Sequence, residues 1–228
     1  MKWREYSGGY FLLSAACANQ AYFLKQVVAG GIHVEKLISL DDKVGGIFPN
    51  LFDIWEGREP QKPTPVLSEQ VLDKVMVSMV FETLEDALEG YREAKPQNPD
   101  VLLIGISLDE KHLPEFHDWR NHSNDENGEG VVLCLGKRQP ASNSGMFAGY
   151  DIAGYGLGGK LLTFLGNHLL EDYLSLDPNL SINEFGLFPE QQKAEELASY
   201  TNDVLKDLVG AEEDLIWLPW KVTVYEGL

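Results

Sequence analysis

Short apolar runs alternate with stretches of helical periodicity along this chain, and this alternation restricts the folds that it can adopt. Val101–Leu108 is an apolar-rich run of strand length. Leu84, Ala87, Leu88 and Tyr91 recur at spacings of three and four residues, which gives a helix one apolar face. Strands and helices that are apolar on one side must pack against each other in layers. The sequence therefore predicts an α+β fold, with helices packed on a mixed sheet.

The other expected elements follow from the same two periodicities and from glycine and proline positions. Further strands are predicted at Tyr10–Ala16, Val75–Phe81, Val131–Leu135, Met146–Tyr155 and Trp217–Tyr225. Helices are predicted at Asn19–Val28, Thr83–Tyr91, Leu113–Trp119, Lys160–Leu174 and Glu190–Leu208, with Thr83 and Asp86 as a relative of the capping box. No internal repeat is evident.

Chain length and the position of a proline-rich stretch indicate how these elements are grouped into domains. The chain has 228 residues, of which 44% are hydrophobic, so it can bury a substantial core. Residues 1–228 are predicted to form a single α+β domain. The proline-rich stretch Pro60–Pro65 is stiff, and it places a candidate lobe boundary near residues 57–66.

Cysteine content and hydropathy bear on the compartment. Cys17 and Cys134 are the two cysteines, too few for a disulfide framework or a cysteine-rich zinc site. No run approaches the roughly twenty apolar residues of a membrane-spanning helix. A reducing, cytoplasmic location is the resulting expectation.

Negative charge is concentrated in one part of the sequence. Thr163–Trp220 holds twelve Asp or Glu residues and two Lys, a balance of −10 within a net charge of −18. Such a region repels nucleic acid and anionic membranes, and it attracts a basic protein. The sequence therefore favours a basic protein partner.

The helix that follows Pro189 is the strongest candidate for the binding surface. Its inward stripe is predicted to consist of Ala194, Leu197, Ala198, Thr201, Leu205 and Leu208. The expected partner-binding residues lie outside this stripe or directly after the helix, and they are Glu195, Glu196, Asp203, Asp207, Glu212, Glu213 and Asp214. The alternative is an ordinary solvated helix face. Trp217 and Trp220 are either aromatic anchors for the partner or core residues.

A glycine motif supports a different, enzymatic interpretation. Gly154, Gly156 and Gly159 have the spacing of a dinucleotide fingerprint, between a predicted strand and a predicted helix, and Lys160 follows. Main-chain amides there would hold a phosphate. Against this, the motif does not open a βαβ unit, and strong negative charge follows it. A turn that lets strand and helix pack closely is the simpler interpretation.

Two further patterns are weaker. His112, His117 and His122 recur every five residues, which cannot place three rings on one helical face, so solvated loop histidines are expected instead of a metal site. Ser123–Gly128 resembles the middle of a calcium loop, but Ser123 and Cys134 stand where carboxylates are required. No metal or cofactor is predicted.

A family resemblance involves the last eighty residues or so. Phe147–Tyr155, Ile182–Leu187, the helix containing Ala194 and the closing Trp217-Leu-Pro-Trp220 together resemble bacterial immunity-type proteins that accompany polymorphic toxins. The resemblance implies neutralisation of a toxin by tight stoichiometric binding, without catalysis. It identifies no binding residue, because each inhibitor is fitted to its own toxin.

The functional hypothesis is a non-catalytic, cytoplasmic, immunity-like protein that neutralises a basic toxin or effector through its acidic C-terminal surface. One alternative is a small enzyme or ligand-binding protein that uses the Gly154–Gly159 loop for a phosphate-bearing ligand. Another is a structural or scaffold component of an acidic assembly.

Overall fold

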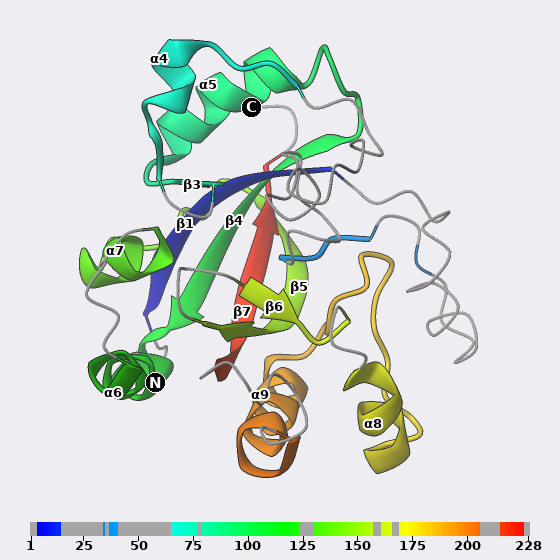
Figure 1. Cartoon of the computed structure of the whole chain (residues 1–228). Coiled ribbons are helices and arrows are strands. Elements are labelled where there is room, and N and C mark those ends of the chain that lie inside the picture. The colour runs from blue at the N-terminus through cyan, green and yellow to red at the C-terminus, as the bar shows by residue number, and fades with distance from the viewer. Residues whose placement is uncertain are drawn as a thin grey trace, which may run out of the picture.

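The computed structural model describes residues 4–14, 34, 37–40, 65–76, 79–123, 130–156, 161–165, 169–205 and 215–225 (Figure 1). Its strands are β1 (Glu5–Ser14), β2 (Val75–Met76), β3 (Val80–Phe81), β4 (Val101–Asp109), β5 (Met146–Tyr155), β6 (Leu161–Thr163) and β7 (Ile216–Val224). Its helices are α4 (Glu69–Leu72), α5 (Leu84–Ala94), α6 (Leu113–Ser123), α7 (Val131–Gly136), α8 (Leu169–Leu176) and α9 (Gln191–Tyr200), with the short turns η2 (Glu110–His112) and η4 (Thr201–Leu205). The α+β class is confirmed.

The strands form one sheet in the order β2-β3-β1-β4-β7-β5-β6. Every described strand pair is antiparallel, so the expectation of a mixed sheet is corrected. The reason is the position of β7. Strands β4 and β5 run in the same direction, but β7 lies between them and runs the opposite way. Two strands that would have formed a parallel pair are thereby each given an antiparallel neighbour.

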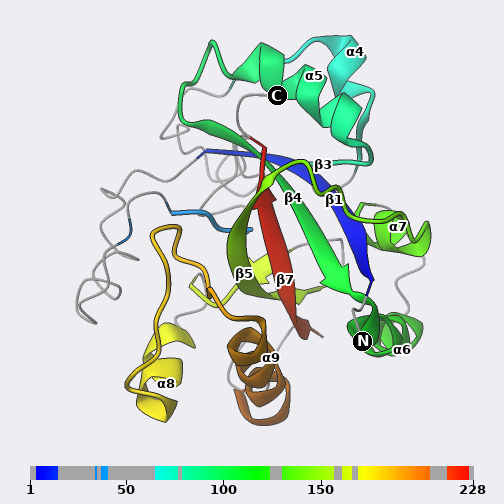
Figure 2. The ribbon, with the colours of Figure 1, turned by 180° about the vertical axis from the view of Figure 1, so that it is seen from behind.

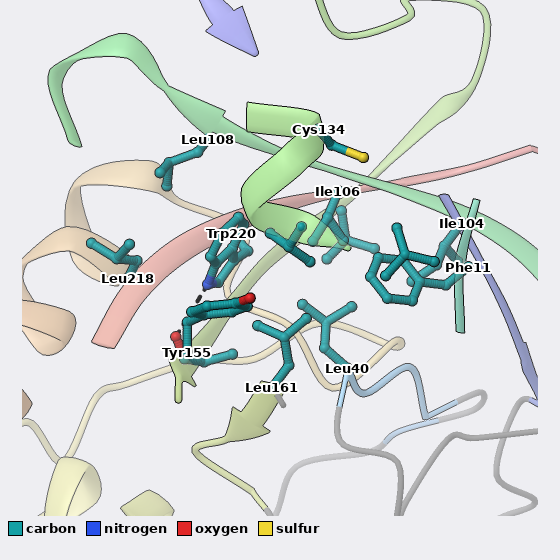
Figure 3. Close-up of a cluster of buried hydrophobic side chains, with 14 of the residues drawn as sticks. Phe11, Leu40, Ile104, Ile106, Leu108, Cys134, Tyr155, Leu161, Leu218 and Trp220 are labelled. Atoms are coloured by element: carbon teal, nitrogen blue, oxygen red, sulfur yellow. Dashed lines mark hydrogen bonds between the residues drawn. The ribbon is translucent and has the colours of Figure 1, made fainter. Parts of the chain in front are cut away.

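Side chains alternate between the two faces of the sheet, and each face has its own core. One face packs against α6 and α7, and its centre includes Ile106, Tyr155 and Trp220 (Figure 3). The opposite face is covered at two separate places. Tyr10, Leu103 and their neighbours pack under α4 and α5, whereas Ile152 and Trp217 pack with α8 and α9. Figure 2 shows α5 and α9 at opposite ends of the sheet, with β4 and β7 between them.

Two of the predicted strands are wrong in detail. Val75–Phe81 is a hairpin of β2 and β3, because the chain reverses at Met79, whose φ is 58°. Val131–Leu135 is helix α7, with Val131, Val132, Cys134 and Leu135 buried. A short apolar run buried on all sides has the same composition in a strand and in a helix, so its sequence does not distinguish them.

The predicted helix Lys160–Leu174 is also wrong over its first part. Leu161–Thr163 is strand β6, which pairs with Ala153–Tyr155 of β5, and α8 starts only at Leu169. The apolar residues of this segment match helical spacing, but they are divided between two elements. Phe164 and Leu165 are buried in the turn that joins them.

Other elements match expectation. The Thr83 hydroxyl accepts a hydrogen bond from the amide of Asp86 and so caps α5, as predicted. Strands β4 and β7 lie within a residue of their predicted limits, and β1 begins at Glu5 instead of Tyr10. Helix α6 continues through Ser123, beyond its predicted end at Trp119. The expected helix Asn19–Val28 lies outside the described residues.

The candidate lobe boundary at residues 57–66 also lies almost wholly outside the described part of the chain. Strand β1 precedes it and β2 to β7 follow it, yet all belong to one sheet. The single-domain assignment stays a prediction.

Candidate functional site

Residues 169–205, here called the acidic end, carry most of the predicted binding surface. They form α8, α9, η4 and the segment between them, at the bottom of Figure 1. They contain eight Asp or Glu residues and one Lys. Six of the eight carboxylates are exposed, and they belong to Glu171, Asp172, Glu184, Glu190, Glu196 and Asp203. The acidic end therefore presents a strongly negative surface.

The orientation of α9 agrees with the predicted amphipathic pattern. Ala194, Leu197, Ala198, Thr201 and Leu205 are all buried, and Leu208 lies outside the described residues. Residues 191–200 are α-helical and residues 201–205 form a π-helical turn. The inward stripe is thus confirmed as far as Leu205.

Two polar contacts fix the end of α9 on the sheet. The Thr201 hydroxyl donates to the Leu197 carbonyl (2.9 Å) and lies 2.6 Å from the Tyr173 hydroxyl. The Asn202 side chain accepts from the Trp217 amide (2.9 Å) and donates to the Trp217 carbonyl (2.8 Å). The described pairing of β7 with β4 covers only Lys221–Val224 of β7. Asn202 satisfies main-chain groups of Trp217, which precedes that stretch. Pro219 also precedes it, where a missing N–H removes no β4–β7 bond.

The outward residues of α9 have weak internal partners. The Glu196 side chain is 53% exposed and lies 3.4 Å from the Lys193 ammonium. Asp203 accepts a hydrogen bond from the Ser199 hydroxyl at 3.3 Å. Exposed contacts of this kind contribute little to stability, so both carboxylates are accessible to another molecule.

Glu195 differs from its neighbours. Its carboxylate lies 2.5 Å from the Lys111 ammonium and 3.8 Å from Nε2 of His112, so it connects α9 to η2. Burial lowers the pKa of His112, and the nearby Glu195 carboxylate partly opposes that effect. Among the predicted binding residues that the structure describes, Glu195 is the one engaged in a cross-element ion pair.

The remaining predicted binding residues are Asp207, Glu212, Glu213 and Asp214, which lie outside the described residues. Of the predicted set, the structure therefore places Glu195 and Glu196 on α9 and Asp203 on η4, which follows it directly.

A second acidic region has a different character. Residues 65–100, here called the α5 end, hold eight Asp or Glu residues with three Lys or Arg. Lys74 lies 3.0 Å from the Asp86 carboxylate and 2.6 Å from that of Glu89. Glu93 accepts hydrogen bonds from the amide and hydroxyl of Ser68. The hydrogen bond from the Thr83 side chain is the largest cause that lowers the pKa of Asp86. The hydrogen bond from the Ser68 amide is the largest cause that lowers the pKa of Glu93. Asp86, Glu89 and Glu93 are thus engaged in contacts within the fold, whereas Glu69, Asp73 and Glu85 are exposed.

The structure decides the role of the two tryptophans. Trp217 is 1% exposed and Trp220 is fully buried, and the Trp220 indole donates to the Ala153 carbonyl at 3.1 Å. Both are core residues, and the alternative that they anchor a partner is wrong.

The glycine motif lacks the context that phosphate binding requires. Gly154 lies inside β5, where an added Cβ would come within 2.9 Å of the Trp217 ring. The next described element is strand β6, which pairs back on β5, where the prediction had a helix. Residues 157–160, which include Gly159 and Lys160, lie outside the described part of the chain. Gly154 therefore lets a tryptophan of the neighbouring strand β7 pack closely, and it does not lie in the expected turn between strand and helix.

The histidines are not loop residues, contrary to prediction. His112 lies in η2 and is partly buried, and His117 lies on α6. Burial lowers the pKa of His117, as it does for His112. Within the described residues, no group of three His, Cys, Asp or Glu side chains is arranged to hold a metal ion. The calcium-like segment lies outside them, apart from Ser123.

Sequence reasoning missed one feature of the acidic end. Leu176 and Val204 are each 54% exposed among its carboxylates. Val204 could have been found, because it falls outside the inward stripe of its helix. Partly buried Tyr200 lies one turn before it. The surface therefore combines charge with apolar and aromatic area.

The described residues include no helix that is long and apolar enough to cross a bilayer. Comparison with protein-family models, with curated proteins and with solved structures finds no match.

Proposed function

We propose that this chain is a non-catalytic, immunity-like protein that binds and neutralises a basic toxin or effector with its acidic end. One observation carries the proposal. Four exposed carboxylates of the acidic end, those of Glu171, Asp172, Glu184 and Glu190, form no ion pair with any described residue. At the α5 end, by contrast, Asp86, Glu89 and Glu93 are engaged in internal contacts.

A negative surface of this kind suits a basic partner for two physical reasons. Complementary charge raises the association rate of two proteins and suppresses binding to wrong partners. Exposed Val204 and partly buried Tyr200 inside the charged surface supply contact area that excludes water. The bacterial origin and cytoplasmic location of such a protein belong to the same proposal.

Two buried side chains that could act as a nucleophile or a base are unsuited to these roles at neutral pH. Burial raises the pKa of the Cys134 thiol to about 12, so it stays protonated and unreactive at neutral pH. Burial also raises the pKa of Tyr150 to about 12. Its hydroxyl donates to Gln191 and is not a base.

Charge reversal at matched places tests the proposal. The test variant carries Glu171→Lys, Glu196→Lys and Asp203→Lys, and the control carries Glu69→Lys, Asp73→Lys and Glu85→Lys at the α5 end. All six residues are exposed, so both variants should fold, and both change the net charge equally. The probe is a basic protein recovered from the native host with the unmodified chain as bait, with affinity measured by calorimetry and association rate measured at several salt concentrations.

We expect the test variant to lose at least about 100-fold in affinity, while the control loses less than about tenfold. The association rate of the unmodified chain should fall steeply with salt, and its dissociation rate should change little. Equal losses in the two variants would mean that only total charge matters. An unchanged test variant would place the interface elsewhere.

A further inference from the structure

Two strand pairs of the sheet have the same register. Strand β1 pairs with β4 so that Tyr10 lies opposite Gly105, and β5 pairs with β7 so that Tyr150 lies opposite Lys221. Ser7 opposite Ser107 corresponds to Phe147 opposite Thr223, and Ser14 opposite Val101 corresponds to Gly154 opposite Trp217. A shared register over this length means that each residue of one pair has an equivalent in the other.

The irregularities of the two pairs also coincide. Each pair has a bulge at the equivalent place, and each bulge ends in a glycine with positive φ, at 107° for Gly9 and 142° for Gly149. A tyrosine follows each glycine. Bulges are local features with a defined position, so two at equivalent positions constitute independent evidence of a relation.

The chain segments that pack against the two bulge glycines are also equivalent. An added Cβ at Gly9 would meet Val80 and the Phe81 carbonyl, and one at Gly149 would meet Leu187 and the Phe188 carbonyl. Phe81 pairs with Tyr10, and Phe188 forms an isolated bridge with Tyr150. Both phenylalanines are fully buried.

A helix then follows each phenylalanine at the same distance. The N-cap of α5 is Thr83 and that of α9 is Glu190, two residues after the respective phenylalanine. Ala87 and Ala194, each four residues after the N-cap, are fully buried against the sheet.

A side chain at an equivalent position also binds the strand that follows each helix. Lys95 follows α5 and donates to the carbonyl of Val101 at 2.8 Å. Asn202 stands at the same position after the N-cap of α9, and it donates to the carbonyl of Trp217 at 2.8 Å. Val101 and Trp217 are equivalent residues of β4 and β7 by the register above.

We infer that the chain contains two copies of one β-β-α-β unit, related by an approximate twofold axis. The first unit comprises β1, β3, α5 and β4, and the second comprises β5, Phe188, α9 and β7. The units meet where β4 pairs with β7. In that pairing Ile106 lies opposite Val222, and these two residues are equivalent to each other in the two units. An axis through this pair exchanges the units, so the β4–β7 contact has the self-complementary form of a twofold homodimer interface.

The inferred repeat differs from the expectation that the chain has none. The retained residues are few and far apart, namely the bulge glycine, the tyrosine after it, the buried phenylalanine and the helix alanine. They are kept because each occupies a position that its backbone or packing demands. Most other positions differ between the units, so no periodic similarity is visible in the sequence.

Circular permutation of the whole chain tests whether the units are separate building blocks. One permutant joins the ends with a glycine-serine linker of about twelve residues and opens the chain between the units, at residues 124–129. Two controls open it inside a unit at equivalent places, residues 95–100 and 206–214. Folding is measured by thermal melting and by hydrogen exchange of β4 and β7.

We expect the permutant opened between units to melt within about 5 °C of the parent, and the two controls to lose considerably more, by similar amounts. In the unpermuted chain, Gly9→Ala and Gly149→Ala should each lower the melting temperature by more than about 5 °C, because both need positive φ and have no room for Cβ. The control is Gly136→Ala, where nothing lies within 4 Å, and it should be silent.

Equal tolerance of all three openings would overturn the inference. A permutant that fails only when opened between the units would also do so. If none of the three permutants folds, the melting temperatures of the Gly9→Ala and Gly149→Ala variants are the test. An unchanged melting temperature in either variant would count against equivalence.

Discussion

The first and second units share one architecture and differ in what they do with their charges. In the first, Lys74 joins two carboxylates of α5, and Ser68 binds a third. Around the helix of the second, residues 169–205 leave six of eight carboxylates exposed, against four of eight in residues 65–100 around the helix of the first. The buried positions of the two helices correspond, whereas their surfaces do not. Backbone geometry and core contacts therefore define the unit, and its surface is free to acquire a separate function.

The comparison predicts its largest effect in the core. Ala87→Asp and Ala194→Asp each bury a charge at equivalent, fully buried positions under the two helices. Each should cost more than about 4 kcal/mol in the free energy of unfolding, enough to unfold a marginal domain. Urea denaturation followed by tryptophan fluorescence measures it. A variant that is tolerated in one unit only would break the equivalence of the helices.

Replacing Lys95 or Asn202, which bind the strand after each helix, should lower the free energy of unfolding by less. Asn202→Ala removes two hydrogen bonds to Trp217 and should cost about 2 kcal/mol, because it leaves the amide and carbonyl without these partners. Lys95→Met keeps the aliphatic stem and should cost about 1 kcal/mol, since one of its two bonds is exposed. The measurement is again the free energy of unfolding in urea. Values in the reverse order would mean that the two contacts are not alike.

Acidification should reveal the asymmetry between the units, because His112 contacts the second helix through Glu195. Burial lowers the folded pKa of His112 and of His117 below the unfolded value of about 6.5. The unfolded chain then binds more protons, so this stability is complete above about pH 6.5 and is lost as the pH falls through the folded pKa values. Melting temperatures between pH 8 and 5 should fall accordingly.

His112→Asn is the control for this effect. It should flatten the part of the pH profile that His112 causes, without changing the loss below about pH 4 that arises from carboxylates such as Asp86. A profile that does not change in this variant would assign the acid sensitivity to His117 or to other groups.

The smallest expected effect is none at all. ATP, GTP, NAD or FAD should not raise the melting temperature, because a strand and not a helix follows the Gly154–Gly159 motif. A saturable stabilisation that Lys160→Ala abolishes would contradict this expectation, and it would favour the phosphate-binding alternative.

Sequence patterns predicted the parts of the fold whose signals are local. The Thr83 cap, the buried stripe of α9 and the long strands β4 and β7 each follow from spacing within one element. Strand and helix could not be distinguished for Val131–Leu135, where burial on all sides removes periodicity. The hairpin at Met79 and the division of residues 160–174 depend on contacts with β1 and β5, which the local sequence does not contain.

The candidate site shows the same division. Spacing alone identified Glu196 and Asp203 as outward residues, and both are exposed. It could not show that Glu195 meets Lys111, because these residues are distant in sequence and come together only through the fold. Nor could it separate a carboxylate that stabilises the fold from one that remains accessible, since that depends on whether a cation from another element reaches it.

The central position of β7 has a consequence for biosynthesis. When the ribosome has completed β4 and β5, some sixty further residues separate Tyr155 from Ile216, the first residue of β7. During that interval two strands destined for the middle of the sheet have no partner on their inner edges, and such edges invite pairing with other chains. Translation rate and chaperone occupancy over residues 156–215 should therefore influence the yield of native protein more than they would over an equal stretch elsewhere in this chain.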